Sequence, residues 1–386
     1  MSGIGRRFAR LAYRLPGPLR RSLRRVPGMR RLRRQMTGAP GGPPPASGSL
    51  RPVVYLPTWA RWDVMRQRPQ YLLAAFARAG HPVFFVDPRE SRRRVADGVT
   101  IVPSLDEVPA GHTILYTHFA PLRDLFSRFH DPVIVYDVLD DLSIYDADEV
   151  GMPEPSRVRS HHPAVMETAD VVIASSPVLA DRHGAERDDI LLVENGVELH
   201  RFAAHTQRPP DLPDTAPIIG YHGAVARWFD FDLLAAVAAD NPDWWLVLVG
   251  PVSPEVRSDL DAMPRNVVSL GERPSDAIPA YVAAFDVGAI WFVVDDMTRG
   301  VSPLKLFELL AAGVPVVSTP LPACEGVPGV AVAADPVAFA AALHTALEVD
   351  DDGRAALRAA AAGASWDERI APLLERLDRQ GSRRVP

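Results

Sequence analysis

The sequence is poor in several kinds of residue, and each shortage excludes something. Cys324 is the one cysteine among 386 residues, so an internal disulfide is excluded and a reducing compartment or a cysteine-poor proteome is indicated. No stretch of eighteen apolar residues occurs in the sequence, so no segment is expected to span a membrane. No known repeat period stands out either. The length predicts two domains with ample core.

Lysine is the scarcest charged residue. Lys305 is the one lysine, while lysine and arginine together number 42. A GC-rich coding background would replace lysine by arginine wherever either serves. The surviving lysine is therefore a candidate for a role that needs a compact ammonium rather than a planar guanidinium. Chance in codon usage is the alternative.

The residues around Lys305 predict a helix that begins at a ligand. Ser302 is a favourable N-cap and Pro303 suits the first helical position, while Gly313 predicts the end of the helix. Lys305 and Glu308 share one face at i,i+3 spacing. The helix dipole favours a phosphate at this N-terminus, where Lys305 adds positive charge, and Glu308 could accept hydrogen bonds from a ribose. A surface ion pair is the other interpretation of the two charges.

The first 62 positions contain no acidic residue, and Asp63 is the first aspartate or glutamate in the chain. Residues 1–34 contain twelve arginines, so the net charge of −6 leaves −18 for the rest of the chain. Residues 1–50 therefore predict a basic arm followed by a Pro/Gly linker. Its spaced apolar residues predict an anchor on an anionic membrane surface through residues 1–34. A nucleic-acid-binding arm, a transit peptide and a start-codon artefact are the alternatives; the acidic body argues against nucleic acid as a partner.

Beyond the arm, strand and helix patterns alternate in two halves. Near-continuous apolar strands alternating with helices predict parallel sheets covered on both faces. We expect an α/β protein with two doubly wound, Rossmann-like domains that face a cleft. The expected domains are 51–205 and 206–365, with a C-terminal helix at 366–386 that packs back on the first domain. The expected strands are Val53–Pro57, Pro82–Val86, Thr113–Thr117, Val133–Asp137, Val171–Ser175, Ile190–Glu194, Pro217–Tyr221, Trp244–Val249, Val267–Leu270, Val287–Phe292 and Val314–Ser318.

Several segments carry a joint resemblance: residues 302–308 with 313–317, residues 220–224, and residues 66–70, 170–176 and 193–197. Together they resemble the retaining GT-B glycosyltransferases, in particular the subgroup that builds bacterial surface polysaccharides of the teichuronic-acid type. Residues 302–308 with 313–317 are similar to the donor-binding signature of that family, and residues 220–224 to its glycine-rich turn. The resemblance covers roughly residues 51–380. The signature at Lys305 and Glu308 is fairly specific, whereas a glycine turn alone is weak.

The resemblance implies transfer of a hexose-type sugar, with retention, from a nucleotide diphosphate sugar to a cell-envelope polysaccharide or lipid-linked acceptor. It implies no cofactor and no obligatory metal. We expect Gly223, Arg227, Ser302, Lys305 and Glu308 to bind the donor, with Lys305 and Arg227 stabilising the departing diphosphate. Many relatives carry a glutamate at the position of Gly300, so that contact with the sugar is missing or comes from elsewhere.

The first domain is expected to contact the sugar and the acceptor. His118 follows a predicted strand, and family members often have a histidine that touches the sugar there; a structural histidine is the alternative. Asp137 and Asp140 could orient an acceptor hydroxyl or bind a divalent ion, or belong to a solvated acidic loop with Asp141. Trp59 could stack on a sugar or lie in the core.

Three functions remain open at this stage. The first is a glycosyltransferase at the cytoplasmic face of the plasma membrane, held there peripherally. The second is a nucleotide-sugar 2-epimerase of the same fold, which needs no lipid acceptor and no basic arm. The third, suggested by Gly300, is a non-catalytic protein that binds a nucleotide sugar.

Overall fold

The computed structural model describes residues 40–42, 50–58, 60–63, 66–140, 155–203, 207–214 and 217–383. The basic arm at 1–34, Trp59 and Asp141 lie outside these residues. Contacts divide the chain into two compact units. Unit 1 contains Met1–Trp62, Leu73–Asp137 and Leu142–Val172, and unit 2 contains Asp63–Leu72, Val138–Asp141 and Ile173–Pro386. The domain boundaries expected from the sequence stay a prediction. In the described part of the chain, no helix has the length and hydropathy needed to cross a membrane.

The first sheet has eight strands in the order β3-β4-β2-β1-β5-β6-β7-β8. The pairings of β1 with β2 and β5, and of β5 with β6, are parallel, whereas β3 pairs with β4 antiparallel. The strands are β1 Val53–Tyr55, β2 Val83–Val86, β3 Arg94–Ala96, β4 Val99–Val102, β5 Ile114–Thr117, β6 Val133–Val138, β7 Val171–Ala174 and β8 Leu191–Leu192. The helices up to residue 202 are α4 Arg68–Arg78, η1 Leu105–Glu107, η2 Ala120–Arg128, α5 Pro155–Thr168, α6 Pro177–His183 and α7 Leu199–Phe202.

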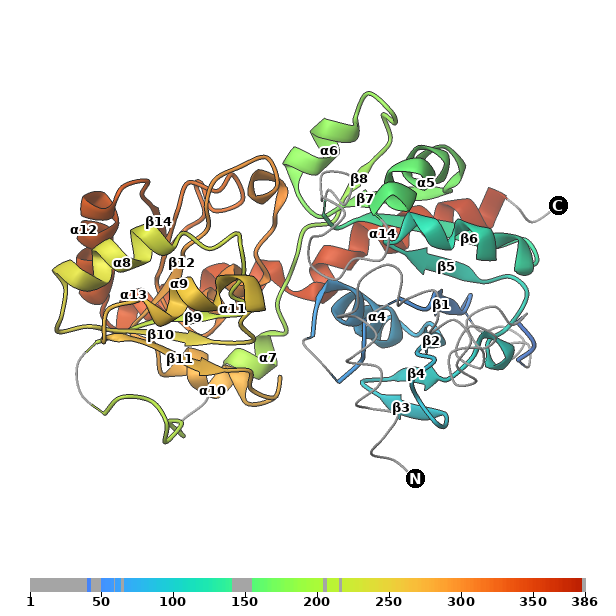
Figure 1. The fold of residues 1–386 in the computed structure, drawn as a ribbon. Helices are drawn as coiled ribbons and strands as arrows, with labels where there is room; N and C mark the ends of the chain where they lie inside the picture. The colour runs from blue at the N-terminus through green and yellow to red at the C-terminus, as the bar shows by residue number, and fades with distance from the viewer. Residues whose placement is uncertain are drawn as a thin grey trace, which may run out of the picture. The chain divides into compact units, whose positions relative to one another are not determined.

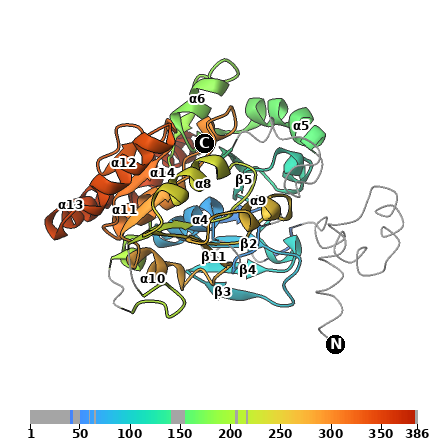
Figure 2. The same ribbon diagram turned by 60° about the vertical axis from the view of Figure 1, so that its left-hand side comes forward.

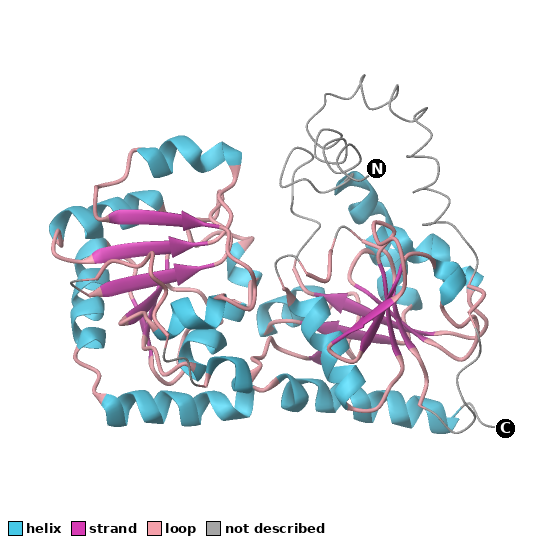
Figure 3. Cartoon of the chain, turned by 90° about the horizontal axis from the view of Figure 1, so that it is seen from below, coloured by secondary structure: helices cyan, strands magenta, loops and turns pink. Residues whose placement is uncertain are grey.

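The second sheet has six strands in the order β11-β10-β9-β12-β13-β14. Each pair of neighbouring strands in this sheet is parallel, and the arrows that are clearly visible in Figure 3 point the same way. The order reverses between β9 and β12, which makes the carboxyl end of β9 a topological switch point, the usual ligand position in such sheets. The strands are β9 Ile218–His222, β10 Trp245–Val249, β11 Val267–Gly271, β12 Val287–Ile290, β13 Val316–Ser318 and β14 Val330–Val332.

Helices cover both faces of the second sheet. On one side α8 packs against α12, and on the other α7 packs against α10 and α11 (Figure 1). Helices α11 and α13 lie side by side (Figure 2). The helices of this part are α8 Phe231–Asp240, η3 Pro254–Val256, α9 Arg257–Asp261, α10 Ile278–Ala283, η4 Thr298–Gly300, α11 Leu304–Ala311, α12 Pro336–Leu347, α13 Asp351–Ala361, η5 Ala362–Ala364 and α14 Trp366–Arg383.

The strands expected from the sequence are all present, and each end agrees within two residues. The expected C-terminal helix is also present, as α14 Trp366–Arg383. Three short strands were not expected, namely β3, β4 and β14. Two of them, β3 and β14, are three-residue edge strands with mostly half-buried or exposed residues. The apolar pattern that identifies a buried strand is therefore weak in them.

Close approach of the backbone shapes the centre of unit 2. A Cβ on Gly220 would lie 2.1 Å from the ring of Phe285. Gly250 has a φ of +155°, and a Cβ on it would lie 2.0 Å from the carbonyl oxygen of Gly223. The absence of a side chain thus lets Phe285 pack against β9 at Gly220, and lets the loop after β10 meet the loop after β9 at Gly250.

This contact yields a stability prediction. Gly250→Ala should lower the free energy of unfolding by at least ~3 kcal/mol, because the methyl group overlaps backbone that cannot move aside. Gly271→Ala is the matched control: its φ is +72°, but nothing lies within 4 Å of its Cβ position, so only the backbone cost of ~1–2 kcal/mol applies. Urea denaturation followed by circular dichroism measures both values. An equal loss of unfolding free energy in the two variants would contradict the prediction, because it would mean that the loop moves and removes the overlap with Gly223.

Candidate functional site

The helix predicted around Lys305 is α11, and its start differs from the expectation by one residue. Helix α11 begins at Leu304 with Pro303 in the N-cap position and no side-chain cap, so the prediction of Ser302 as N-cap was wrong. Instead the carbonyl of Ser302 accepts a hydrogen bond of 2.6 Å from Asn195 Nδ2. That bond fixes the backbone just before the helix. The end is as expected, since Gly313 has a φ of +78°.

Lys305 is a half-buried cation over aromatic rings. Its Nζ lies 5.1 Å from the ring centre of Tyr221 and 4.8 Å from that of Phe292. Burial lowers the pKa of Lys305 to about 8, and the neighbouring Glu308 opposes that shift. The ammonium therefore stays mainly protonated at neutral pH. The rings stabilise a positive charge that has lost much of its water.

Gly223 places the turn after β9 directly against Lys305. It has a φ of +125°, and a Cβ there would lie 3.1 Å from Lys305 Cε. Its own N–H donates to the carbonyl of Val249 at 2.9 Å. The amide of Gly223 is thus used within the protein. What the glycine provides is room for a ligand and a lysine to approach the same turn.

Glu308 is 7% exposed, and each of its two oxygens faces a different neighbour. The hydroxyl of Tyr71 donates to Oε1 at 3.1 Å, and His222 Nε2 lies 3.5 Å from Oε2. Burial raises the pKa of Glu308, while the Tyr71 hydrogen bond and the charge of Lys305 act in the opposite direction. The carboxyl group is therefore costly to ionise in this position.

The sequence reasoning did not assign a role to His222. This residue ends β9, is 5% exposed, and its Nε2 has no hydrogen-bond partner. Burial, and then the charge of Lys305, lowers the pKa of His222 to about 3. The imidazole is neutral at physiological pH, so its approach to Glu308 is not an ion pair. Its place between Tyr221 and Gly223, at the carboxyl end of a strand, was the available signal.

Tyr71 was also missed, although it directly follows residues 66–70, one of the segments that resemble the family. Its ring stacks on that of Trp366, with centres 5.3 Å apart and an interplanar angle of 12°. The guanidinium carbon of Arg66 lies 4.9 Å from the same ring centre, and Arg66 pairs with Glu198 at 3.0 Å. The position of the Tyr71 hydroxyl is thus fixed by groups from three parts of unit 2.

Asn195 links two of the segments that resemble the family, residues 66–70 and 302–308. Its Oδ1 accepts a hydrogen bond of 3.1 Å from Arg68, while its Nδ2 binds the Ser302 carbonyl. Segments 66–70, 193–197 and 302–308 therefore meet in one hydrogen-bonded group. The resemblance that joined them in sequence corresponds to contact in space.

Two other predicted positions can be placed in unit 2. Arg227 lies in the loop after β9, with Nη2 3.3 Å from Met297 Sδ. Gly300 ends η4, and its carbonyl accepts a hydrogen bond of 2.7 Å from Ser176 Oγ. A Cβ on Gly300 would lie 3.2 Å from Leu179 Cδ2. A side chain at position 300 would therefore require a small shift of Leu179.

The predicted residues of unit 1 lie at the ends of neighbouring strands. His118 follows β5 and is 3% exposed, and its Nδ1 shares a hydrogen bond of 3.1 Å with the hydroxyl of Tyr55. Asp137 is fully buried in β6 and accepts a hydrogen bond from the hydroxyl of Tyr116. Asp137 is therefore not part of a solvated loop. Asp140, in unit 2, is half-buried.

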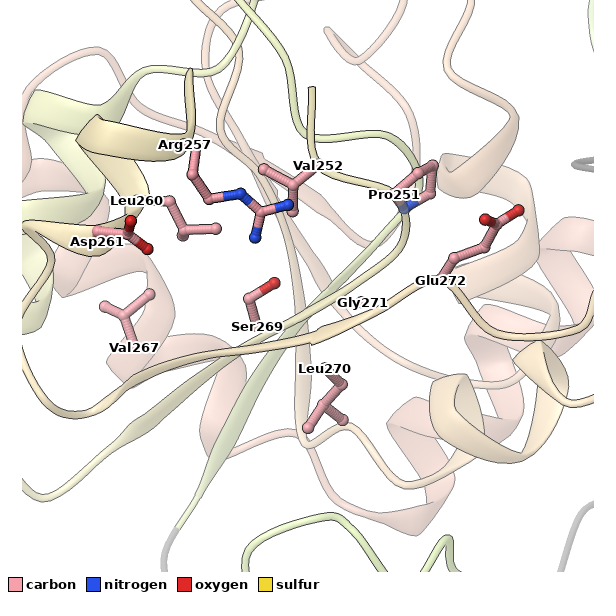
Figure 4. Close-up of a pocket in the computed structure, with 10 residues that line it drawn as sticks. All are labelled: Pro251, Val252, Arg257, Leu260, Asp261, Val267, Ser269, Leu270, Gly271 and Glu272. Atoms are coloured by element: carbon pink, nitrogen blue, oxygen red, sulfur yellow. The ribbon is translucent and has the colours of Figure 1, made fainter. Parts of the chain in front are cut away.

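A cavity of about 550 Å³ lies in unit 2 at the carboxyl ends of β10 and β11 (Figure 4). Arg257 and Asp261 border it from α9, and Ser269 and Glu272 from β11 and the loop that follows. None of the predicted donor-site residues lines it. Its charged lining residues Arg257, Asp261 and Glu272 are exposed, whereas the charged groups Lys305 and Glu308 are half-buried and buried. The cluster around Lys305 is therefore the better candidate site.

The fold and this site now allow comparison with known proteins. Several solved glycosyltransferase structures superimpose over most of the chain, and the fold is GT-B. The catalytic domain of Arabidopsis thaliana starch synthase IV, bound to ADP and acarbose, has a TM-score of 0.65 at 12% identity, covering 87% of this chain and 100% of that one. Anabaena HepE in complex with UDP and glucose has a TM-score of 0.60 at 15% identity, covering 84% and 99%.

Comparison of the amino-acid sequence with known families and proteins finds similarity over part of the chain. Residues 216–349 match the family model "Glycosyl transferases group 1". The chain is also 32% identical over 174 residues to a protein of Bacillus subtilis (strain 168) whose name assigns it to teichuronic acid biosynthesis as a glycosyltransferase, TuaH. That match spans 43% of this chain and 44% of the relative, so the chain matches less than half of that protein's length.

The raised pKa of Glu308 predicts how stability depends on pH. A carboxyl whose pKa is higher in the folded state stabilises below its ordinary value of 4.5 and loses that contribution as the pH rises toward its folded pKa. Glu308→Gln retains an oxygen for Tyr71 but cannot ionise. The variant should therefore be more stable than wild type at pH 7, with the difference growing by up to about 1.4 kcal/mol for each pH unit within that window. Thermal unfolding across the pH range measures this difference.

The two proteins should converge in stability below about pH 4, where both side chains are neutral. The exposed Glu325 provides the control, since Glu325→Gln should give a small difference that hardly varies with pH. A Glu308→Gln variant that is less stable at pH 7 than at pH 4, relative to wild type, would contradict the assignment.

Proposed function

We propose that this chain is a retaining glycosyltransferase. It moves a hexose-type sugar from a nucleotide diphosphate sugar to a cell-envelope polysaccharide or lipid-linked acceptor. The observation that carries the proposal is the position of Lys305: a half-buried ammonium at the first turn of α11, against the Gly223 turn and the end of β9. This arrangement lies within the segment that matches the glycosyltransferase family model.

The chemistry follows from where charge develops. When the bond between sugar and diphosphate breaks, the sugar carbon becomes oxocarbenium-like and the departing diphosphate gains negative charge. A cation that is already in place and partly desolvated stabilises this state more than the ground state. Lys305 supplies that cation, together with the N–H groups at the start of α11 near Ser302. Arg227 adds a second positive charge, and the reaction needs neither a metal nor a cofactor.

The remaining candidate residues contact the donor, the transferred sugar or the acceptor. Lys305 binds the diphosphate at the turn where Gly223 leaves room for it, and Glu308 accepts hydrogen bonds from the ribose. In the first domain, His118 contacts the transferred sugar. The hydrogen bond shared by the Tyr55 hydroxyl and His118 Nδ1 fixes the ring of His118, which suits a histidine that contacts a substrate. Asp140, with Trp59, orients the acceptor, while the fully buried Asp137 holds the hydroxyl of Tyr116.

The nature of the acceptor rests on the relative from Bacillus subtilis, whose name places it in teichuronic acid biosynthesis. A lipid-linked or envelope acceptor puts the enzyme on the inner face of the plasma membrane. Residues 1–34 are the proposed peripheral anchor, since their twelve arginines suit an anionic leaflet.

Gly300 favours one alternative, a non-catalytic protein that binds nucleotide sugars. The family resemblance implies a glutamate at this position, and a Cβ on Gly300 would lie 3.2 Å from Leu179 Cδ2. A 2-epimerase of the same fold is the other alternative. Incubation of the purified protein with a panel of nucleotide sugars and an acceptor extract separates the three. A transferase gives nucleoside diphosphate and a glycosylated acceptor, an epimerase gives an epimerised sugar, and a binding protein gives neither.

Lys305 gives the sharpest binding prediction. Lys305→Ala should weaken nucleoside diphosphate binding by ten- to a hundredfold, since a charged hydrogen bond contributes ~1.5–3 kcal/mol. Lys305→Arg should also weaken it, because the larger guanidinium does not fit beside Gly223 and over the rings of Tyr221 and Phe292. Calorimetric titration measures both affinities. The exposed Arg265 supplies the control, and Arg265→Ala should bind like wild type. Wild-type affinity in both Lys305 variants would refute the assigned role.

The arm gives a separate prediction. Deleting residues 1–45 should leave nucleotide binding intact and release the protein from anionic vesicles, because each arginine near such a surface contributes about 1 kcal/mol. Salt should weaken the binding of the full chain without abolishing it, since apolar residues also insert. Co-sedimentation with anionic and neutral vesicles provides the measurement. Equal recovery of the two forms with anionic vesicles would show that the arm is not the anchor.

A further inference from the structure

Asn195 is a buried side chain that the proposed chemistry does not use. It is 6% exposed, and both ends of its amide group form hydrogen bonds. Its Oδ1 accepts a bond of 3.1 Å from Arg68 Nη1, and its Nδ2 donates to the Ser302 carbonyl at 2.6 Å. Because both bonds are buried, each is costly to break. Asn195 therefore links the first residue of α4 to the backbone two residues before α11 begins.

Arg68 determines which way the amide group of Asn195 faces. A guanidinium has hydrogen-bond donors only, so the amide oxygen must face Arg68 and the amide nitrogen is left for Ser302. Arg68 is 3% exposed, and a side chain packed so tightly has little room to move. The amide group of Asn195 therefore cannot turn over without breaking both of its bonds.

The Ser302 carbonyl is the group that this link controls. The next residue, Pro303, has no N–H, so the peptide group between the two residues presents an oxygen and no donor. An oxygen with partial negative charge would oppose a bound diphosphate if it faced it. The bond from Asn195 directs this oxygen to Nδ2 instead, and it fixes the backbone at which the first turn of α11 begins. That turn contains Lys305 and the N–H groups that have no partner within the helix.

We infer that Asn195 is a positioning residue of the donor site: by holding the Ser302 carbonyl, it fixes the first turn of α11 so that Lys305 and the N–H groups of that turn meet the diphosphate. Arg68 completes the link by fixing the amide group of Asn195. The inference rests on the proposed function. It extends the donor site to two residues outside the segment 216–349 that matches the family model.

The inference separates the two parts of a nucleotide. Loss of the link displaces the groups that meet the diphosphate, so binding of that part should weaken. Glu308, one turn further along α11, is held separately by the hydrogen bond from Tyr71. Binding of the nucleoside part should therefore change little. A general loss of folding would weaken both parts alike.

The test compares a nucleoside diphosphate with its own nucleoside. Calorimetry with ADP, GDP and UDP identifies the diphosphate that wild type binds best, and the corresponding nucleoside is titrated to millimolar concentration by NMR. Asn195→Asp still accepts from Arg68 but cannot donate to Ser302, and Asn195→Leu has a similar branched shape without polar atoms or charge. Each variant should bind the diphosphate at least about tenfold more weakly, with a change of less than about twofold for the nucleoside.

Asn266→Asp is the matched control. Asn266 also donates from Nδ2 to backbone carbonyls in unit 2, those of Ala238, Asn241 and Trp244. It directly precedes β11, at the amino end of the sheet, whereas Lys305 lies at the carboxyl end. Asn266→Asp should lower the melting temperature at least as much as Asn195→Asp and yet leave both affinities unchanged.

Two variants of Arg68 give an independent measurement. Arg68→Lys keeps a donor for Oδ1 and should retain most of the diphosphate affinity, whereas Arg68→Met should lower it as Asn195→Leu does. Wild-type diphosphate affinity in both Asn195 variants, or equal weakening of diphosphate and nucleoside, would overturn the inference. If neither Asn195 variant folds, the Arg68 pair decides, and equal affinities in that pair would overturn it.

Failure of the proposed function looks different. In that case no nucleoside diphosphate binds to wild type, or Lys305→Ala leaves the affinity unchanged. Binding that depends on Lys305 but does not respond to Asn195→Asp or Asn195→Leu would leave the function standing and remove this inference alone.

Discussion

The buried carboxyl group of Glu308 is the constraint on which the rest of the site depends. A carboxyl in this position is costly to ionise, so the protein surrounds it with groups that act on it from different sides. Tyr71 donates a hydrogen bond to it, Lys305 contributes positive charge, and His222 approaches its second oxygen. Each of these partners has its own support, from Trp366 beneath Tyr71 to the rings of Tyr221 and Phe292 beneath Lys305. The site is a connected network in which each group constrains the others.

Two glycine positions make this network possible. The turn at Gly223 brings backbone against the lysine, and Gly250 allows the next loop to pass within contact of that turn. The strand order reverses at β9, so these loops and α11 converge on one edge of the sheet. The fold places the groups at that edge, and the absence of two side chains leaves the room that they need.

Much of the fold follows from the sequence, because apolar strands and helix boundaries leave periodic patterns. The strands of both sheets and the helices at 68–78, 304–311 and 366–383 carry such signals. The edge strands β3 and β14 do not, since half-exposed strands lack the apolar run. Lys305 and Glu308 were recognisable because one is unique in the chain and the other shares its helix face. Tyr71 and His222 were not recognisable. They lie 237 and 86 positions before Glu308, and contacts between residues so far apart leave no local pattern in the sequence. The N-cap was misplaced because Asn195, a distant residue, binds the Ser302 carbonyl.

The isolation of Lys305 has a practical side. It is the one lysine in the sequence, so a reagent that acylates primary amines meets a single side-chain target. A pKa of about 8 leaves an appreciable share of this amine in its nucleophilic, unprotonated form under mildly alkaline conditions. Acylation of Lys305 can therefore be measured without an engineered label. Its extent reports whether the Lys305 amine is free to react or is occupied by a bound ligand.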